Sequence, residues 1–204
     1  MATNLAIDDK LIVEAQTIGG KNTKKAVVTE ALNEYIQRRK QLQITSLFGK
    51  IDFVPDYDYK KNTSARMKVL VDTSIWSLAL RRASVISEDD RILLAELQEL
   101  INEVRVAIIG PIRQELLSGI STKVQFDALQ THLKAFEDLS ITRKDYERAA
   151  EFYNTCRQSG IQGSHIDFLI CSVSAGAGIP IFTSDKDFLG YIKFLPINLH
   201  PPRV

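Results

Sequence analysis

Hydrophobic positions near the start of the chain follow first a strand period and then a helical one. In residues 3–7, Thr, Leu and Ile alternate with smaller residues, which predicts a short strand with one apolar side. Asp8 is suited to cap a following helix, in which apolar residues recur at helical spacing between residues 11 and 18. The pair Gly19–Gly20 is expected to end that helix.

A second, longer helix is predicted to open at Asn22 or Thr23 and to end in a basic run at residues 37–40. Its apolar face is expected to hold Val28, Leu32, Tyr35 and Ile36. A strand of about five residues and two helices bury too little apolar surface to fold alone. The strand also has no partner within this segment. We therefore expect a homodimer whose two N-terminal strands pair as an antiparallel ribbon.

Residues 47–66 show no sustained helical or strand period and are rich in aromatic side chains. This composition is too aromatic for a plain flexible linker. We expect a tail that folds onto a partner surface, with aromatic anchors and cations beside them. The predicted anchors and cations are Phe48, Phe53, Tyr57, Tyr59, Lys60, Lys61 and Arg66.

From Met67 onward, short apolar runs alternate with helical patterns. Strands are predicted at residues 68–71, 106–109, 139–141, 179–182 and 194–199. Helices are predicted at residues 74–82, 88–103, 111–118, 122–136, 143–158 and 164–178. Repeated strand–helix units favour an α/β fold in which helices cover both faces of a parallel sheet. The domain organisation expected is therefore residues 1–46, a tail at 47–66, and an α/β domain at 67–204.

Charge and composition add little to this picture but exclude some classes of protein. Residues 1–66 carry a net charge of +3 and residues 67–204 carry −2, which is compatible with a nucleic-acid-facing head and an acidic pocket. The sequence has no apolar run of about 18 residues and no secretion-signal pattern, so we expect a cytoplasmic protein. Neither Cys156 and Cys171 nor the three histidines have metal-site spacing.

Acidic residues gather where the predicted strands end. In open parallel sheets, ligands bind beyond the carboxyl ends of the strands. At these ends or in the helices that follow lie Asp72, Glu115, Asp167, Asp185 and Asp187, with Ser74 and Thr183 as neighbouring hydroxyls. Several carboxylates in one pocket raise one another's pKa unless a cation is present. Mg²⁺ prefers such oxygen ligands, and a pair of ions about 4 Å apart supports phosphodiester cleavage.

Each acid also has a purely structural interpretation. Asp72 is placed to cap the helix after it, and Ser164 with Asp167 forms a capping-box pattern. Glu115 suits a solvated helix position, and Asp185 suits a turn. All of these acids lie at the same end of their strand–helix units. This shared position favours one acidic pocket over the separate structural interpretations.

Four segments after residue 66 resemble the successive motifs of a PIN-domain ribonuclease of the VapC toxin type: "MKVLVDTSIW", "PIRQELLSG", "SHIDFLICSVSAGAG" and "IFTSDKDF". Residues 1–66 resemble a VapB-type antitoxin with a ribbon-helix-helix DNA-binding module, through "TNLAID", "KKAVVTEALNEYIQRRKQ" and "LFGKIDFVPDYDYK". Antitoxin and toxin are normally two chains, whereas here they are continuous.

The resemblance implies a catalytic pocket of Asp72, Glu115, Asp167 and Asp185, with Asp187 as a further ligand of Mg²⁺ or Mn²⁺. It implies endonucleolytic cleavage of RNA, with growth arrest as the outcome. We expect a homo-oligomer formed through both the ribbon-helix-helix and the PIN modules, because ribbon dimers and toxin dimers together can build a tetramer or a larger assembly. The resemblance also implies that the tail wraps the toxin and places a basic residue in the acidic pocket. Because the two parts are joined, the tail acts at an effective concentration of order mM, which predicts a self-inhibited nuclease.

The N-terminal segment is predicted to bind operator DNA. In a two-stranded ribbon, Asn4 points toward the major groove, where its amide can read an adenine edge. Lys24 and Lys25 begin the second helix, a position suited to phosphate contacts. Two alternatives remain open: a transcriptional repressor whose large domain is a catalytically idle oligomerisation module, and a metal-dependent phosphodiesterase that acts on DNA.

Overall fold

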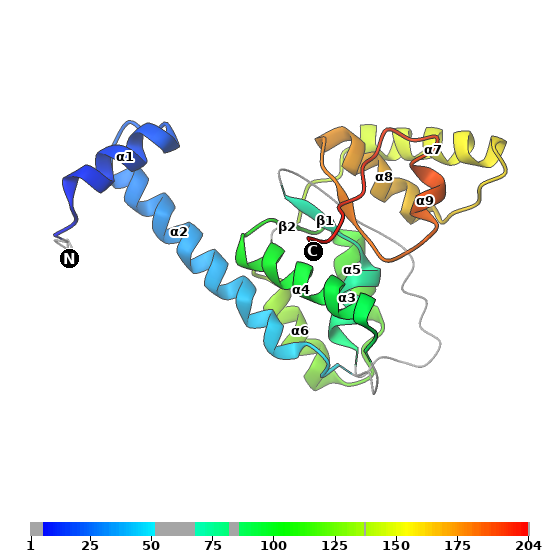
Figure 1. Cartoon of the computed structure of the whole chain (residues 1–204), viewed down its shortest axis with the longest axis horizontal. Coiled ribbons are helices and arrows are strands. Elements are labelled where there is room, and N and C mark those ends of the chain that lie inside the picture. The colour runs from blue at the N-terminus through cyan, green and yellow to red at the C-terminus, as the bar shows by residue number, and fades with distance from the viewer. Residues whose placement is uncertain (1–5, 52–67, 82–85, 137, 204) are drawn as a thin grey trace. The chain divides into compact units, whose positions relative to one another are not determined.

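The computed structural model of the 204-residue chain describes residues 6–51, 68–81, 86–136 and 138–203. The chain divides into two compact units, Met1–Arg39 and Lys40–Val204. Figure 1 shows both units, which are described separately below. The predicted domain boundaries at residues 46 and 66 remain predictions. None of the helices in the described ranges is both long and apolar enough to cross a membrane.

The described part of the first unit holds the first helix and all but the last turn of the second helix, and both helices begin at local capping signals. Helix α1 (Asp9–Gly19) begins after Asp8, whose carboxylate accepts the backbone N–H of Lys10 at 2.8 Å. It ends at Gly20, which adopts the left-handed conformation with φ of +61°. Helix α2 (Lys24–Leu42) begins after Thr23, whose hydroxyl accepts the N–H of Ala26. Both predicted helices are therefore confirmed, while most of the predicted strand at 3–7 lies outside the described residues.

The second unit is built on a three-stranded parallel sheet in the order β2–β1–β3. Its strands are β1 (Val69–Val71), β2 (Val106–Ala107) and β3 (Ile181–Phe182). Leu70 pairs with Ala107 on one side and with Ile181 on the other. All strand residues are buried, as expected when helices cover both faces of a parallel sheet. The α/β fold class is confirmed.

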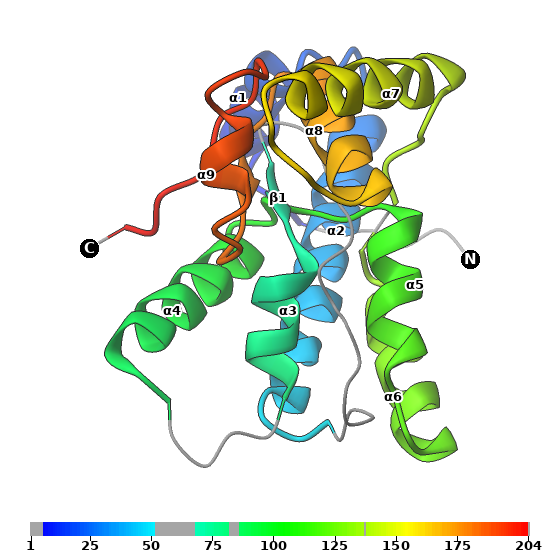
Figure 2. The ribbon, with the colours of Figure 1, turned by 90° about the vertical axis from the view of Figure 1, so that its right-hand side faces the viewer.

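Helices connect and cover these strands. Their bounds are α3 (Thr73–Leu80), α4 (Glu88–Asn102), α5 (Gly110–Ser118), α6 (Lys123–Leu133), α7 (Arg143–Gln158), α8 (His165–Ala177) and α9 (Phe188–Tyr191). In Figure 2, β1 runs between α4 on one side and α5 with α6 on the other, and α7 lies beside α8 at one end. The predicted helices correspond to α3 to α8 within a few residues, because capping residues mark most of their ends.

Two predicted strands are wrong, and one helix was not predicted. Residues 139–141 form no strand, because the single bridge to the sheet joins Ile108 to Asp138. Residues 194–199 likewise contribute only one bridge, between Ile181 and Leu199. The four-residue helix α9 is too short to produce a helical period in the sequence.

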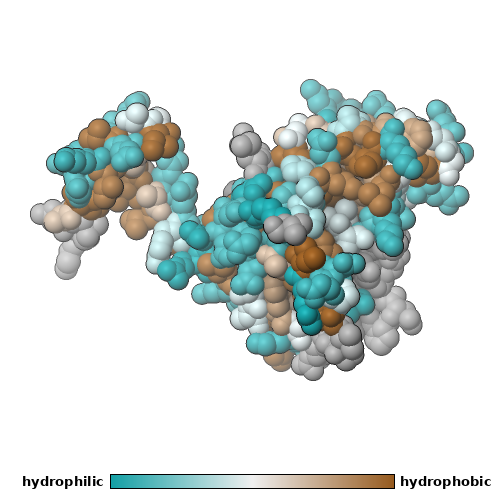
Figure 3. Space-filling view, viewed as in Figure 1, coloured by the Kyte–Doolittle hydropathy of each residue, from teal (hydrophilic) through white to brown (hydrophobic). Residues whose placement is uncertain are grey.

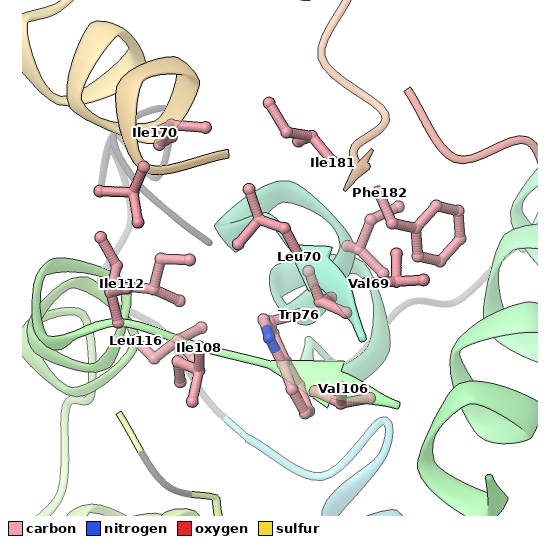
Figure 4. Packing of buried hydrophobic residues seen from close by; sticks show 14 of the residues in the cluster. Val69, Leu70, Trp76, Val106, Ile108, Ile112, Leu116, Ile170, Ile181 and Phe182 are labelled. Carbon is pink, nitrogen blue, oxygen red and sulfur yellow. The ribbon is translucent and has the colours of Figure 1, made fainter. Parts of the chain in front are cut away.

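Large apolar side chains fill the space between the sheet and the helices. Figure 4 shows Leu70 and Ile181 from the sheet, Ile112 and Leu116 from α5, and Trp76 from α3 packed together. All five side chains are fully buried. The core thus anchors the ends of β1 and β3, from which the candidate site is built.

The short segment from Lys40 to Ile51 packs into the core of the second unit, although the sequence assigns it to the antitoxin-like part. It contains the 3₁₀ helix η1 (Gln43–Leu47), which contacts α6. Ile44 and Ile51 are buried, and Ile51 forms a parallel bridge with Arg81 at the end of α3. These contacts make the segment a structural part of the second unit.

Candidate active site

Asp72 follows β1 directly and occupies the N-cap position of α3, where the residue is only 2% exposed. Two hydroxyl groups donate to its Oδ2: Ser74 at 2.5 Å and Thr183 at 2.7 Å. Thr183 follows β3, the strand paired with β1. The pairing of neighbouring parallel strands therefore brings the end of β3 to the carboxylate at the end of β1.

Burial raises the pKa of Asp72 to about 6. The hydrogen bonds from Ser74 and Thr183 act to lower the pKa, and the charge of Asp185 acts to raise it. The shift follows from desolvation, which disfavours the charged form of a buried carboxyl. A cation beside Asp72 would restore the charged form.

Asp167 lies in the first turn of α8 and completes the capping box that the sequence indicated. Its backbone N–H donates to the hydroxyl of Ser164 at 3.0 Å, and its Oδ2 accepts the N–H of Ser164 at 2.8 Å. Oδ2 also accepts the hydroxyl of Tyr191 at 3.3 Å. The structural interpretation of this aspartate is therefore correct, but it accounts for only one of the two carboxylate oxygens.

The other oxygen, Oδ1 of Asp167, is buried without a hydrogen-bond partner. Burial, together with the smaller effect of the Asp72 and Asp185 charges, raises the pKa of this carboxyl to about 7, although its hydrogen bonds with Ser164 act to lower the pKa. A buried carboxylate oxygen without a partner carries a desolvation cost that a bound cation or water removes. Asp167 therefore combines a fixed orientation with one oxygen available to a ligand.

The remaining predicted acids differ in their surroundings. Asp185 is half-buried in the turn after β3, where its backbone N–H donates to Thr183 at 2.9 Å. Asp187 is exposed, and its N–H donates to the carboxylate of Asp185 at 3.0 Å. Glu115 is buried on α5. The charges of Asp72, Asp167 and Asp185 act on one another, so these three lie in one electrostatic environment.

Within the described ranges, no three His, Cys, Asp or Glu side chains are grouped closely enough to enclose a metal ion. This does not conflict with Mg²⁺, which keeps several waters and is usually held by one or two carboxylates. The unpartnered Oδ1 of Asp167 and the raised pKa values of Asp72 and Asp167 fit such a water-rich cation. Asp72 and Asp167 are the residues best suited to hold it, with Asp185 beside them.

The predicted DNA contacts fall only partly within the described structure. Lys24 and Lys25 are the first residues of α2 and are exposed, and Lys24 forms an ion pair with Asp9. Asn4 lies outside the described residues.

Of the predicted tail residues, Phe48 packs partly buried against the core of the second unit. The others lie outside the described ranges, namely Phe53, Tyr57, Tyr59, Lys60, Lys61 and Arg66.

Apolar side chains of α1 and α2 are exposed in the single chain. Figure 3 shows hydrophobic residues gathered on the visible face of the N-terminal unit. Ile18 is 81% exposed, and other large apolar residues are between two-fifths and two-thirds exposed. These are Ile7, Leu11, Val13, Leu32, Tyr35 and Ile36. Such an apolar surface is typical of an interface with another molecule.

One residue of the site was not anticipated from the sequence. Tyr191 lies on α9, a four-residue helix that gives no periodic signal, and its hydroxyl contacts Asp167. The hydroxyls of Ser74 and Thr183 were anticipated from their positions after β1 and β3, and both contact Asp72.

Comparisons with known proteins agree with this description. Residues 69–192 match the family described as PIN domain, and residues 1–47 match the family described as bacterial antitoxin of type II TA system, VapB. The crystal structure of FitAcB from Neisseria gonorrhoeae is similar in fold, with a TM-score of 0.52 at 18% sequence identity. That similarity covers 65% of this chain and 96% of the other. A search of curated proteins found no match.

Proposed function

Because the chain belongs to the PIN-domain family and carries a VapB antitoxin segment ahead of that domain, we propose that it is a toxin–antitoxin fusion whose C-terminal unit is a Mg²⁺- or Mn²⁺-dependent endoribonuclease. A PIN domain makes this unit a nuclease in general terms. The proposal adds the substrate, the metal and the control of activity by the N-terminal segment.

The observation that carries the proposal is the burial of two carboxylates that have too few partners to stabilise their negative charge. Asp72 and Asp167 have raised pKa values, and Asp167 keeps one buried oxygen without a partner. A divalent cation held by Asp72 and Asp167 would supply the positive charge that these groups lack, and it would supply water activation and leaving-group stabilisation for phosphodiester cleavage. The protein's own residues hold the two carboxylates in place through Ser74, Thr183 and Ser164.

Control by the antitoxin segment is supported by its packing in the second unit. Gly49 donates its N–H to the carbonyl of Ala79 at 2.8 Å, and Ile51 donates to Leu80 at 3.0 Å. These hydrogen bonds join residues 49–51, at the start of the predicted tail, to the C-terminal end of α3, whose N-terminal end follows Asp72. We propose that the following residues neutralise the acidic pocket through Lys60, Lys61 or Arg66.

The test uses full-length protein, since Ile44 and Ile51 belong to the core and deletion of the antitoxin segment would disturb folding. A chain with Lys60, Lys61 and Arg66 all changed to Ala should cleave RNA with Mg²⁺ faster than the unchanged chain. EDTA should abolish this cleavage, and Asp72→Asn should lower it by more than about 100-fold, beyond the loss typical of residues behind a metal ligand. Cleavage that survives Asp72→Asn would exclude the metal pocket. A single-stranded DNA substrate of the same sequence tests the choice of RNA.

We further propose that the N-terminal unit forms a homo-oligomer and binds operator DNA, so that the fusion represses its own synthesis. The exposed apolar side chains of α1 and α2 support this, because self-association would cover them. Asn4→Ala should abolish operator binding in a gel-shift assay while the oligomer persists. Normal binding by this variant would contradict the role of Asn4.

A further inference from the structure

Tyr191 ends α9 and is fully buried, although its side chain carries a polar group. Its ring packs against Phe168 and Phe188, with centroids 5.0 Å and 5.2 Å apart. Its hydroxyl lies 3.3 Å from Oδ2 of Asp167 and 3.4 Å from the carbonyl oxygen of Gln162. A buried tyrosine hydroxyl needs such partners, and here one partner is a candidate site residue.

A glycine, Gly163, leaves space for the Tyr191 hydroxyl. A Cβ atom at Gly163 would collide with the Tyr191 hydroxyl and would lie 2.9 Å from Cε2 of Phe168. The φ angle of Gly163 is not positive, so space and not backbone conformation accounts for glycine at this position. Gly163 therefore provides the room in which the hydroxyl reaches Asp167.

The two carboxylate oxygens of Asp167 differ in their hydrogen bonds. Oδ2 accepts the N–H of Ser164 and the hydroxyl of Tyr191. Oδ1 is buried and has no partner. Two donors on one oxygen, from two different elements, restrict rotation of the carboxylate and keep the other oxygen directed away from both.

We propose that Tyr191 is a positioning residue that holds the Asp167 carboxylate through Oδ2, so that Oδ1 faces the divalent cation. This inference rests on the metal-dependent function proposed above. Tyr191 does not touch the cation and acts only through Asp167. Loss of a group behind a metal ligand typically costs 10–100-fold in metal affinity, and we expect that range for loss of the hydroxyl.

The experiment is isothermal titration with Mn²⁺ of the full-length chain in which Lys60, Lys61 and Arg66 are changed to Ala, alongside thermal unfolding without metal. This tail-substituted chain is the reference, because a tail cation is proposed to occupy the pocket of the unchanged chain. Tyr191→Phe in this reference keeps the ring and its aromatic contacts but removes the hydroxyl, so we expect about 10–100-fold weaker Mn²⁺ binding with a similar unfolding temperature. Tyr146→Phe is the matched control, because Tyr146 is 56% exposed on α7, and it should bind Mn²⁺ as the reference does.

The outcomes separate this inference from the function on which it rests. If Asp167→Asn weakens Mn²⁺ binding and Tyr191→Phe does not, Tyr191 has only a packing role and the inference is overturned. If the tail-substituted chain binds no Mn²⁺, both the inference and the metal-dependent function are overturned.

A second measurement does not depend on the stability of the Tyr191→Phe variant. The ultraviolet difference spectrum of the tail-substituted chain should show a tyrosine signal when Mn²⁺ binds, because the cation withdraws charge from the carboxylate that Tyr191 contacts. Tyr146→Phe should retain this signal, and Asp167→Asn should lose it. Mn²⁺ binding without any tyrosine signal would count against the inference.

Discussion

Thr183 donates a hydrogen bond from its hydroxyl to Oδ2 of Asp72 at 2.7 Å, across 111 positions of sequence. The contact joins the end of β3 to the end of β1, and the same hydroxyl accepts the N–H of Asp185 at 2.9 Å. Thr183 thus contacts two of the candidate acids, Asp72 through its carboxylate and Asp185 through its backbone N–H.

Removal of this hydroxyl should impair the site without unfolding the protein. Thr183→Val keeps the shape of the side chain but removes one of the two hydroxyl groups that donate to Asp72. We expect RNA cleavage by the tail-substituted chain to fall about 10–100-fold, as for other groups behind a metal ligand. The rate is measured at saturating Mg²⁺. Thr155→Val on the exposed side of α7 is the control, and equal rates for both variants would refute the role of Thr183.

The antitoxin-like segment should contribute directly to the stability of the nuclease unit. Ile44 is fully buried in the core of that unit. Ile44→Ala removes buried methyl groups and leaves a cavity, so we expect a loss of about 2–5 kcal/mol in the free energy of unfolding. Urea denaturation followed by Trp76 fluorescence measures it, since Trp76 belongs to the same core. Val124→Ala, at a position 80% exposed on α6, should change little. An unchanged midpoint for Ile44→Ala would show that the segment is not part of this core.

Glu96 should make stability depend on pH in the acid range. Burial raises the pKa of this carboxyl, but hydrogen bonds from Arg203 and His200 outweigh burial and hold the pKa below its usual value. A lowered folded-state pKa gives stability that is present above the unfolded value of 4.5 and is lost as pH falls through the folded value. At pH 7, Glu96→Gln should cost about 1–3 kcal/mol.

The difference between the unchanged chain and Glu96→Gln should shrink as pH falls below 4.5. Urea titrations of both proteins at a series of pH values provide the measurement. Glu99→Gln, an exposed neighbour on α4, is the control and should follow the unchanged chain. A difference that stays constant across this range would contradict the proposed ionisation of Glu96.

Exposed apolar residues of α2 should mediate self-association. Leu32 is 51% exposed in the single chain, and covering a leucine in an interface is worth about 1.5–3 kcal/mol. Leu32→Glu should therefore weaken self-association at least about 10-fold. Light scattering over a dilution series measures this, with Val124→Glu on α6 as the control. Identical masses for Leu32→Glu and the unchanged chain at every concentration would exclude this face from the interface.

Local signals explain why much of the fold could be predicted. The caps Asp8, Thr23 and Ser164 act within a few residues of the helix ends they mark, so they can be recognised without the tertiary structure. The buried run at β1 likewise reads as a strand because all its side chains are apolar. The strand predicted at residues 139–141 failed because its single sheet contact depends on the path of the chain after α6, which no local pattern encodes.

By itself, the sequence determined the alternation of strands and helices, the family motifs and the identity of Asp72 and Asp167 as candidate site residues. Only the tertiary structure decided that Lys40–Ile51 packs into the core of the second unit, that Asp167 keeps one oxygen without a partner, and that the Tyr191 hydroxyl contacts the other. The physical reason is the range of the interactions. Caps and periodic patterns join residues a few positions apart, whereas core packing and the hydrogen bonds of a site join residues that only folding brings together.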